Sequence, residues 1–260
     1  MRIVRRVIPR APPSFIKGVP DMGGPQSLML VTMPRSGSVY LWRTLAEGLG
    51  LPMVRTSLSD FPDDHLVLAQ FQYLMTFGGV SQEHLDAKPV TLELLKAAGL
   101  APVVNVRDPR QAMVSWLHYL DAEFQTHGQK MFFQDAPADW LGHSFEEKAD
   151  WCVDHHLPKL VTWVEGWLAA EEQLPGILFS SFEDMKADEG VFFDKLLVHW
   201  GIDPGGGVSH PHLDETTRRE TANFRSGQTD EWVSALSGEQ KARASAAIPG
   251  TMKSRFGWID

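Results

Sequence analysis

The chain has 260 residues, a hydrophobic fraction of 43% and a net charge of −9 at neutral pH. That length supports a sizeable core, and the negative charge argues against a nucleic-acid binder. No apolar run approaches the ~20 residues that a membrane-spanning helix needs. No signal-peptide pattern follows the N-terminal arginines, and the single cysteine, Cys152, permits no internal disulfide. We therefore expect a cytoplasmic protein without a transmembrane segment.

Residues 1–26 are predicted to form an extended, basic, proline-rich arm, followed by a single domain over residues 27–260. Five cations and four prolines precede the first acid, Asp21. We expect a solvated leader, with contact to an acidic membrane or a partner as the alternative. The composition of the remaining chain shows no linker that would divide it into two units, and it gives no indication of the oligomeric state.

Apolar runs of strand length alternate with helical patterns along the chain, which is typical of a parallel sheet flanked by helices. The strands are expected, in chain order, at residues 28–31, 53–56, 80–84, 102–106 and 177–179. Helices are expected to begin near Tyr40, Thr91, Pro109, Ser144, Phe192 and Ser237. Asp108 is a suitable N-cap for the third of these helices, and Ser144 with Glu147 forms a capping box for the fourth. Pro158 should kink or divide that fourth helix.

The first strand leads through Thr-Met-Pro-Arg-Ser-Gly-Ser, residues 32–38, into an amphipathic helix. A strand that turns sharply into a helix presents unpaired backbone N–H groups and the positive end of the helix dipole. With Arg35 in the turn, the expected ligand is a phosphate. The segment lacks the upstream glycine and the lysine of a Walker A motif, and a shorter loop suits a single 5′-phosphate better than a triphosphate.

Two further segments could bind an anion. Arg107 ends a central strand, where open α/β sheets bind ligands, and Ser115 lies about two turns into the next helix. Together they could grip a second phosphate, although Arg107 and its neighbour Asp108 could equally pair with nearby groups. Residues 225–227, Arg-Ser-Gly, again combine a cation with a turn, for which an ordinary surface loop is the simpler explanation.

These segments, in this order, resemble the sulfotransferases that use 3′-phosphoadenosine 5′-phosphosulfate (PAPS). That family has Pro-Lys/Arg-Ser-Gly-Ser/Thr after its first strand, Val-Arg-Asp-Pro-Arg with a serine eight residues past the first arginine, and Phe-Arg-Lys-Gly followed by a Trp. Residues 177–186 also resemble the family's strand followed by Tyr-Glu-Asp-Leu/Met-Lys. The matches span roughly residues 28–258. The resemblance implies a three-layer α/β fold of the P-loop NTPase type, with a central parallel sheet.

The resemblance also implies how the nucleotide is held. The 5′-phosphosulfate would contact Arg35 and the backbone after it, and Arg35 would neutralise charge on the departing oxygen. The 3′-phosphate would contact Arg107, Ser115 and the late Arg-Ser-Gly turn, in which a serine replaces the family's lysine. Tyr40 and Phe182 would lie near the adenine. The candidate cofactor-binding residues are thus Arg35, Ser36, Gly37, Ser38, Val39, Tyr40, Arg107, Ser115, Phe182, Arg225, Ser226 and Gly227.

Sulfuryl transfer to a hydroxyl needs a base near neutral pH, a role that histidine can fill. His84 resembles the histidine of the family's His-Leu-Pro segment and is the first candidate. Glu83 is the alternative, because some carbohydrate-acting relatives use a glutamate, and in a strand these two side chains point to opposite faces. His65 is a further candidate, and a structural role for His84 stays open. Relatives carry a lysine where this chain has Gln82.

The sequence therefore predicts an enzyme that moves a sulfuryl group from PAPS to a hydroxyl, or as a second choice an amine, of a small-molecule, lipid or sugar acceptor. The product nucleotide would be 3′,5′-phosphoadenosine (PAP), and no metal would be needed. A catalytically weak nucleotide-binding module of the same fold and a P-loop kinase are the alternatives.

Two smaller expectations concern aromatic and histidine side chains. Residues 57–80 and 121–143 should shape the acceptor pocket, and their aromatic content indicates an apolar or aromatic acceptor. These aromatic residues are Phe61, Phe71, Tyr73, Phe77, Phe124, Phe132 and Phe133. The histidines at positions 155, 156, 210 and 212 lack companions at metal-ligand spacing, so solvated or capping roles are expected for them.

Overall fold

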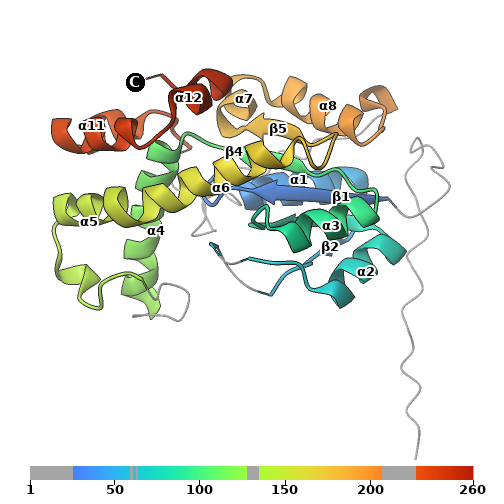
Figure 1. Ribbon diagram of the computed structural model, residues 1–260, viewed down its shortest axis with the longest axis horizontal. Helices are drawn as coiled ribbons and strands as arrows, with labels where there is room; N and C mark the ends of the chain where they lie inside the picture. The colour runs from blue at the N-terminus through green and yellow to red at the C-terminus, as the bar shows by residue number, and fades with distance from the viewer. Residues whose placement is uncertain (1–25, 59–60, 63, 128–134, 207–226, 260) are drawn as a thin grey trace, which may run out of the picture.

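The computed structural model of the protein describes residues 26–58, 61–62, 64–127, 135–206 and 227–259. Five parallel strands in these ranges form one sheet in the order β2-β3-β1-β4-β5 (Figure 1). The strands are β1 (Ser27–Thr32), β2 (Met53–Val54), β3 (Gly79–Glu83), β4 (Val103–Val106) and β5 (Leu178–Ser181). The predicted fold class, an α/β fold with a central parallel sheet, is confirmed.

Some of the predicted features lie outside the described residues. The N-terminal arm is one of them, so the division into an arm and a single domain stays a prediction. The others are Phe132, Phe133, His210, His212, Arg225 and Ser226.

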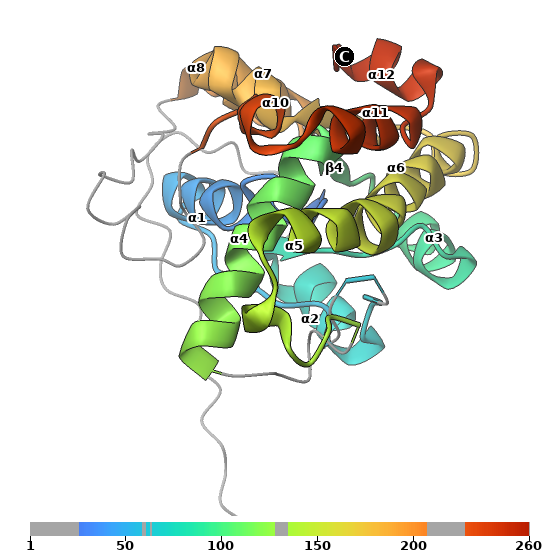
Figure 2. The same cartoon turned by 90° about the vertical axis from the view of Figure 1, so that its left-hand side faces the viewer.

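Helices cover both faces of the sheet and make the fold three-layered (Figure 1). One face carries α1 (Ser38–Leu49), α7 (Phe182–Ala187) and α8 (Glu189–His199). The other carries α2 (Leu68–Phe77), α3 (Pro89–Ala97), α4 (Pro109–His127) and α6 (Leu157–Ala170). The remaining described helices are η2 (Trp140–Gly142), α5 (Phe145–Trp151), η3 (Cys152–His156), η4 (Pro204–Gly206), α10 (Glu231–Ala235), α11 (Gly238–Ala246) and α12 (Gly250–Phe256). Figure 2 shows α4 and α5 in front of one end of the sheet.

The central strand β1 supplies both hydrophobic cores. Successive side chains of a strand point to opposite faces. Leu28 and Leu30 accordingly pack with α1 and α8, whereas Met29 and Val31 pack with the helices of the other face. A strand that is apolar on both faces has to lie between two layers, which is why Leu28–Val31 could be placed from sequence.

Local signals predicted several boundaries correctly. The side chain of Asp108 accepts a hydrogen bond from the backbone N–H of Arg110 at 2.9 Å, as an N-cap does. The expected capping box forms at Ser144, and a second one forms at Ser237, where another helix was expected to begin. The helix is divided near Pro158 as expected, since the π-helix η3 separates α5 from α6 and Pro158 lies in the first turn of α6. Within the described ranges, none of the helices has both the length and the apolar character to cross a bilayer.

Other expectations were wrong. The second strand is only two residues long, and α2, α7, α10 and α12 were not predicted. Of the aromatic residues expected in the acceptor pocket, Phe71 and Phe124 are buried in the core, and Tyr73 and Phe77 are exposed on α2. Of these aromatic residues, Phe61 is partly buried and packs against the core.

His156 is neither solvated nor a cap, which corrects the sequence-based expectation. Its ring stacks on Trp116 with centroids 4.6 Å apart and meets Phe61 edge-on at 5.9 Å. The side chain is buried among apolar groups, and this burial, with a smaller contribution from Lys159, lowers the pKa of His156 to about 3. The imidazole is therefore neutral in the folded protein across the physiological pH range.

A pH-dependent stability follows from this burial. In the unfolded chain a histidine has a pKa of about 6.5, so protonation below that pH favours unfolding. The stability is retained above about pH 6.5 and decreases as the pH falls toward 3; at pH 5 the loss is ~2 kcal/mol. We expect His156→Phe to remove this loss. The measurement is the free energy of unfolding in urea at pH 7.5 and 5, with the exposed neighbour as a control, His155→Phe. Equal pH dependence in wild type and His156→Phe would contradict the assignment.

Candidate functional site

The candidate site residues lie where the strands end. Residues 33–37 follow β1, His84 follows β3, Arg107 follows β4 and Phe182 follows β5. Because all strands are parallel, these four segments meet at the carboxyl edge of the sheet. The chain leaves β1 toward β2 and β3 on one side and later forms β4 and β5 on the other side, which is the arrangement that opens a ligand crevice in α/β sheets.

The loop after β1 has an unusual backbone conformation and is hydrogen-bonded to a side chain of the neighbouring strand β4. Arg35 has a φ of 65°, which is uncommon for a residue with a side chain, and Gly37 has a φ of 86°. The side-chain amide of Asn105 donates to the carbonyl of Ser36 at 2.9 Å, and the Ser36 hydroxyl donates to the carbonyl of Met33 at 2.7 Å. A side chain at position 37 would also meet the ring of Phe182 at 3.2 Å, so both backbone and space require glycine there.

The first turn of α1 faces the same edge. Gly37 is its N-cap, and no side chain of the described residues caps the helix. The first turn contains Ser38, Val39 and Tyr40, whose backbone N–H groups lie at the positive end of the helix dipole. The Tyr40 ring, however, packs edge-on against Phe193 of α8 at 6.3 Å, on the face of the sheet that α1 and α8 cover.

Arg35 reaches from the loop toward α4. Its Nε donates to the hydroxyl of Ser115 at 3.1 Å, and its guanidinium carbon lies 4.9 Å from the centroid of the Tyr119 ring. The side chain is half-buried. Two predicted anion-binding residues, Arg35 and Ser115, are thus in direct contact although 80 positions separate them.

Arg107 joins the loop to the late turn. Its guanidinium donates to the carbonyl of Arg35 at 2.6 Å and to the carbonyl of Gln228 at 2.5 Å, and it stacks over the Phe182 ring at 4.1 Å. Gln228 follows Gly227, which has a φ of 66°. Burial lowers the pKa of Arg107 to about 10, the charge of Arg35 adds to this shift, and Glu183 opposes it. An anion bound between the two arginines would offset both the burial of the Arg107 charge and its repulsion by Arg35.

The structure therefore brings together Arg35, Arg107, Ser115, Phe182 and the turn at Gly227, as the sequence predicted. The predicted pairing of Arg107 with neighbouring groups also occurs, since it contacts two backbone carbonyls. Arg225, the third arginine predicted to bind the nucleotide, lies outside the described residues. Among the described residues, no three His, Cys, Asp or Glu side chains gather as a metal site would require.

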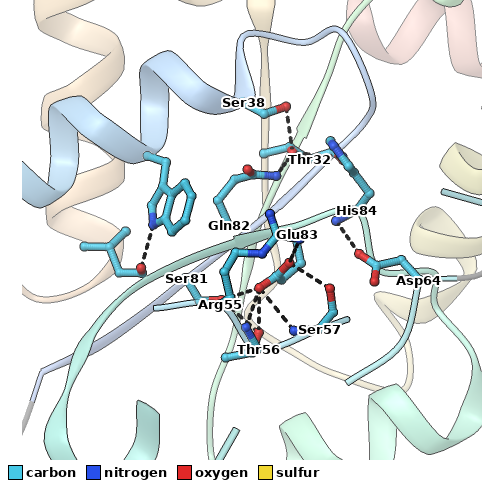
Figure 3. Close-up of polar contacts among 12 residues, drawn as sticks. Thr32, Ser38, Arg55, Thr56, Ser57, Asp64, Ser81, Gln82, Glu83 and His84 are labelled. Carbon is cyan, nitrogen blue, oxygen red and sulfur yellow. Dashed lines mark hydrogen bonds and ion pairs between the residues drawn. The ribbon is translucent and has the colours of Figure 1, made fainter. Parts of the chain in front are cut away.

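His84 lies just beyond β3 and next to the loop (Figure 3). Its Nδ1 is 2.7 Å from the carbonyl oxygen of Thr32. Since a carbonyl can only accept, Nδ1 carries the proton, and Nε2 is the ring nitrogen that can accept one. The backbone N–H of His84 donates to Asp64 at 2.8 Å, which fixes the residue from the other side.

Glu83 points the opposite way, as alternation in a strand requires (Figure 3). Its buried carboxylate accepts hydrogen bonds from the backbone N–H groups of Thr56 and Ser57 and from the Ser57 hydroxyl at 2.8 Å. Arg55 forms an ion pair with it at 3.2 Å. Burial raises the pKa of Glu83, and the hydrogen bond from Thr56 and the charge of Arg55 oppose the shift. These contacts fasten the segment after β2 to the end of β3.

We expect Glu83→Gln to affect stability more than turnover. The new amide would place a donor among donors, so at least one buried hydrogen bond is lost, at a cost of about 1–3 kcal/mol. Urea unfolding should show this loss, whereas turnover per folded molecule should change less than about threefold. The exposed Glu93 provides the control, Glu93→Gln. A hundredfold loss of turnover without loss of stability would instead identify Glu83 as the base.

Sequence reasoning missed some residues that organise the site. Asn105 and Ser180 form a buried hydrogen bond of 2.8 Å beneath the loop, and Asn105 interrupts an otherwise apolar strand, which is a signal that could have been used. Asp64 is buried and holds His84 from 20 positions away, without any local pattern. Tyr119 could have been noticed only as a neighbour of Ser115, one turn further along α4.

No protein-family model matches the chain, and a search of curated proteins finds no match. Among solved structures, the chain is similar to mouse sulfotransferase SULT7A1 in complex with PAP, with a TM-score of 0.54 and 18% identity over 85% of this chain and 82% of that chain. It is also similar to the sulfotransferase domain from the curacin biosynthetic pathway, with a TM-score of 0.45 and 13% identity over 86% of this chain and 99% of that one. The mouse structure shows that this chain has the sulfotransferase fold, with its P-loop-like parallel sheet.

Proposed function

We propose that this protein is a PAPS-dependent sulfotransferase that transfers a sulfuryl group to the hydroxyl of a small-molecule, lipid or sugar acceptor. The observation that carries the proposal is the convergence of Arg35 and Arg107, which follow separate strands, beside the N-terminus of α1, where no side chain of the described residues forms a cap. An anion with two phosphate groups would satisfy both cations and the helix dipole. The fold supports the same class of reaction.

In this proposal the two ends of the nucleotide bind to different elements. Arg35 and the backbone from Ser36 to Tyr40 hold the 5′-phosphosulfate. Arg107 and Ser115 hold the 3′-phosphate together with the late turn, where Arg225 and Ser226 precede Gly227. Phe182, which packs on Gly37 and beneath Arg107, offers its ring near the adenine. Tyr40 supports that role less well, because its ring packs on α8.

The chemistry assigns His84 as the general base. Nε2 of His84 takes the proton of the acceptor hydroxyl while the acceptor oxygen forms a bond to sulfur. The bond between sulfur and the bridging oxygen breaks, its electron pair stays on the 5′-phosphate, and Arg35 stabilises the charge that develops there. Placing charges and groups in advance is the main source of catalysis in such loose transition states. The saturated hydrogen bonding of the Glu83 carboxylate favours His84 over Glu83 in this role.

On α4, the ring of Tyr119 lies 4.9 Å from the guanidinium carbon of Arg35, and the ring of Trp116 lies next to that of Tyr119 with centroids 5.5 Å apart. This aromatic pair supports an apolar or aromatic acceptor better than the residues first expected from sequence do. We also propose that the protein is located in the cytoplasm.

The test measures transfer of labelled sulfate from PAPS to a panel of alcohols, phenols and sugars, with release of PAP as the second readout. Calorimetry compares PAP with ATP and Mg²⁺. Transfer with PAP as the tighter ligand is expected. Tight PAP binding without transfer to any acceptor would favour a nucleotide-binding module, and tighter binding of ATP with Mg²⁺ would favour a kinase.

A further inference from the structure

A buried chain of hydrogen bonds runs from β3 through β1 to the first turn of α1 (Figure 3). The side-chain amide of Gln82 donates to the Thr32 hydroxyl at 2.8 Å, and that hydroxyl donates to the Ser38 hydroxyl at 2.9 Å. All three side chains are buried. Polar groups placed in the centre of a parallel sheet are costly unless they are paired, so this arrangement calls for an explanation.

The chemistry of the groups fixes the direction of the chain. The amide nitrogen of Gln82 can only donate, so the Thr32 hydroxyl must accept from it. A hydroxyl has one proton, and Thr32 gives that proton to Ser38. The Ser38 oxygen therefore receives a hydrogen bond, and no described residue accepts the proton of its own hydroxyl. That proton is available to a ligand at the N-terminus of α1.

We propose that Gln82 is a positioning residue which, through Thr32, turns the hydroxyl proton of Ser38 toward the sulfuryl-bearing end of the nucleotide. This inference rests on the proposed function. A lysine stands at this position in the relatives that the sequence resembles. Here a neutral amide occupies it and contacts Thr32, so it acts on the ligand through two hydroxyls instead of through a charge of its own.

Thr32 also connects this chain to the proposed base. Its hydroxyl donates a hydrogen bond to Ser38, while its backbone carbonyl accepts one from Nδ1 of His84. The Thr32 hydroxyl also lies 3.4 Å from Nδ1 of His84, a longer contact than the 2.7 Å from the carbonyl. Thr32→Val removes the hydroxyl and keeps the carbonyl, so it interrupts the chain to Ser38 and leaves the shorter of the two contacts with His84 in place.

The experiment is a mutant cycle with Gln82→Met, Thr32→Val, Ser38→Ala and the double variant of Gln82→Met with Ser38→Ala. Each single variant is expected to lower kcat about tenfold, and the double variant no further than Ser38→Ala alone, because the residues act in series. The affinity for PAP, which lacks the sulfuryl group, should stay within about twofold, a result that general damage to the site would not produce. Gln72→Met, on the exposed face of α2, is the matched control.

The inference is overturned if Gln82→Met lowers PAP affinity as much as kcat, if the effects of Gln82→Met and Ser38→Ala multiply, or if Gln82→Met leaves kcat unchanged. Thermal unfolding of each variant identifies a loss of structure. Failure of the proposed function is seen separately, since the wild-type protein would then show no transfer in the same assay.

Discussion

Replacing His84 by glutamine is expected to lower kcat for sulfuryl transfer by roughly 10²–10⁴-fold, the range typical for loss of a general base. Glutamine can still donate a hydrogen bond to the Thr32 carbonyl, which the imidazole Nδ1 contacts at 2.7 Å. It cannot take a proton from the acceptor. The expected result is therefore a protein with nearly wild-type stability and PAP affinity that turns over slowly.

The measurements are initial rates at saturating PAPS and acceptor, together with calorimetry of PAP binding. The exposed His65 lies on the neighbouring segment, so His65→Ala is the control and should keep wild-type turnover. Turnover of His84→Gln within about threefold of the wild type would exclude His84 as the base. A loss of turnover in the His65 variant would move the assignment to that residue.

The loop between β1 and α1 could be predicted because its signals are local. A strand apolar on both faces, a cation in a tight turn and a glycine before an amphipathic helix occupy consecutive positions. The opposite orientations of Glu83 and His84 could be predicted for the same reason, since they follow from the alternation of a strand. Which of the two faces the loop depended on the pairing of β3 with β1, which the sequence does not specify.

The missed parts depend on contacts between distant residues. In α2, the large apolar residues Leu68, Tyr73 and Phe77 are exposed while Phe71 and Leu74 are buried, so the helix has no clear apolar face to be read from sequence. The buried state of His156 depends on Trp116, which lies 40 positions earlier. The hydrogen bond from the backbone N–H of His84 to Asp64 joins residues that are 20 positions apart. Such residues give no periodic signal of their own.

Arg107→Met is expected to weaken PAP binding by roughly 10- to 100-fold, the size of one or two charge-assisted hydrogen bonds. The side chain is buried, carries a charge at neutral pH despite the lowering of its pKa to about 10, and lies next to Arg35. Binding a phosphate there would offset the cost of burying two cations close together. If the group recognised is the 3′-phosphate, adenosine 5′-phosphate, which lacks it, should bind the variant and the wild type within about threefold of each other.

Calorimetry measures the affinity of the wild type and of Arg107→Met for PAP and for adenosine 5′-phosphate at two salt concentrations. The four affinities form a double-mutant-type cycle that isolates the interaction between Arg107 and the 3′-phosphate. Lys186→Met removes an exposed cation from α7 and controls for the change in net charge. Because Arg107 also holds the carbonyls of Arg35 and Gln228, thermal unfolding must accompany the binding data. Equal losses for the two nucleotides would mean that Arg107 only supports the loops, and the assignment of the 3′-phosphate to the junction of β4 and α4 would then be wrong.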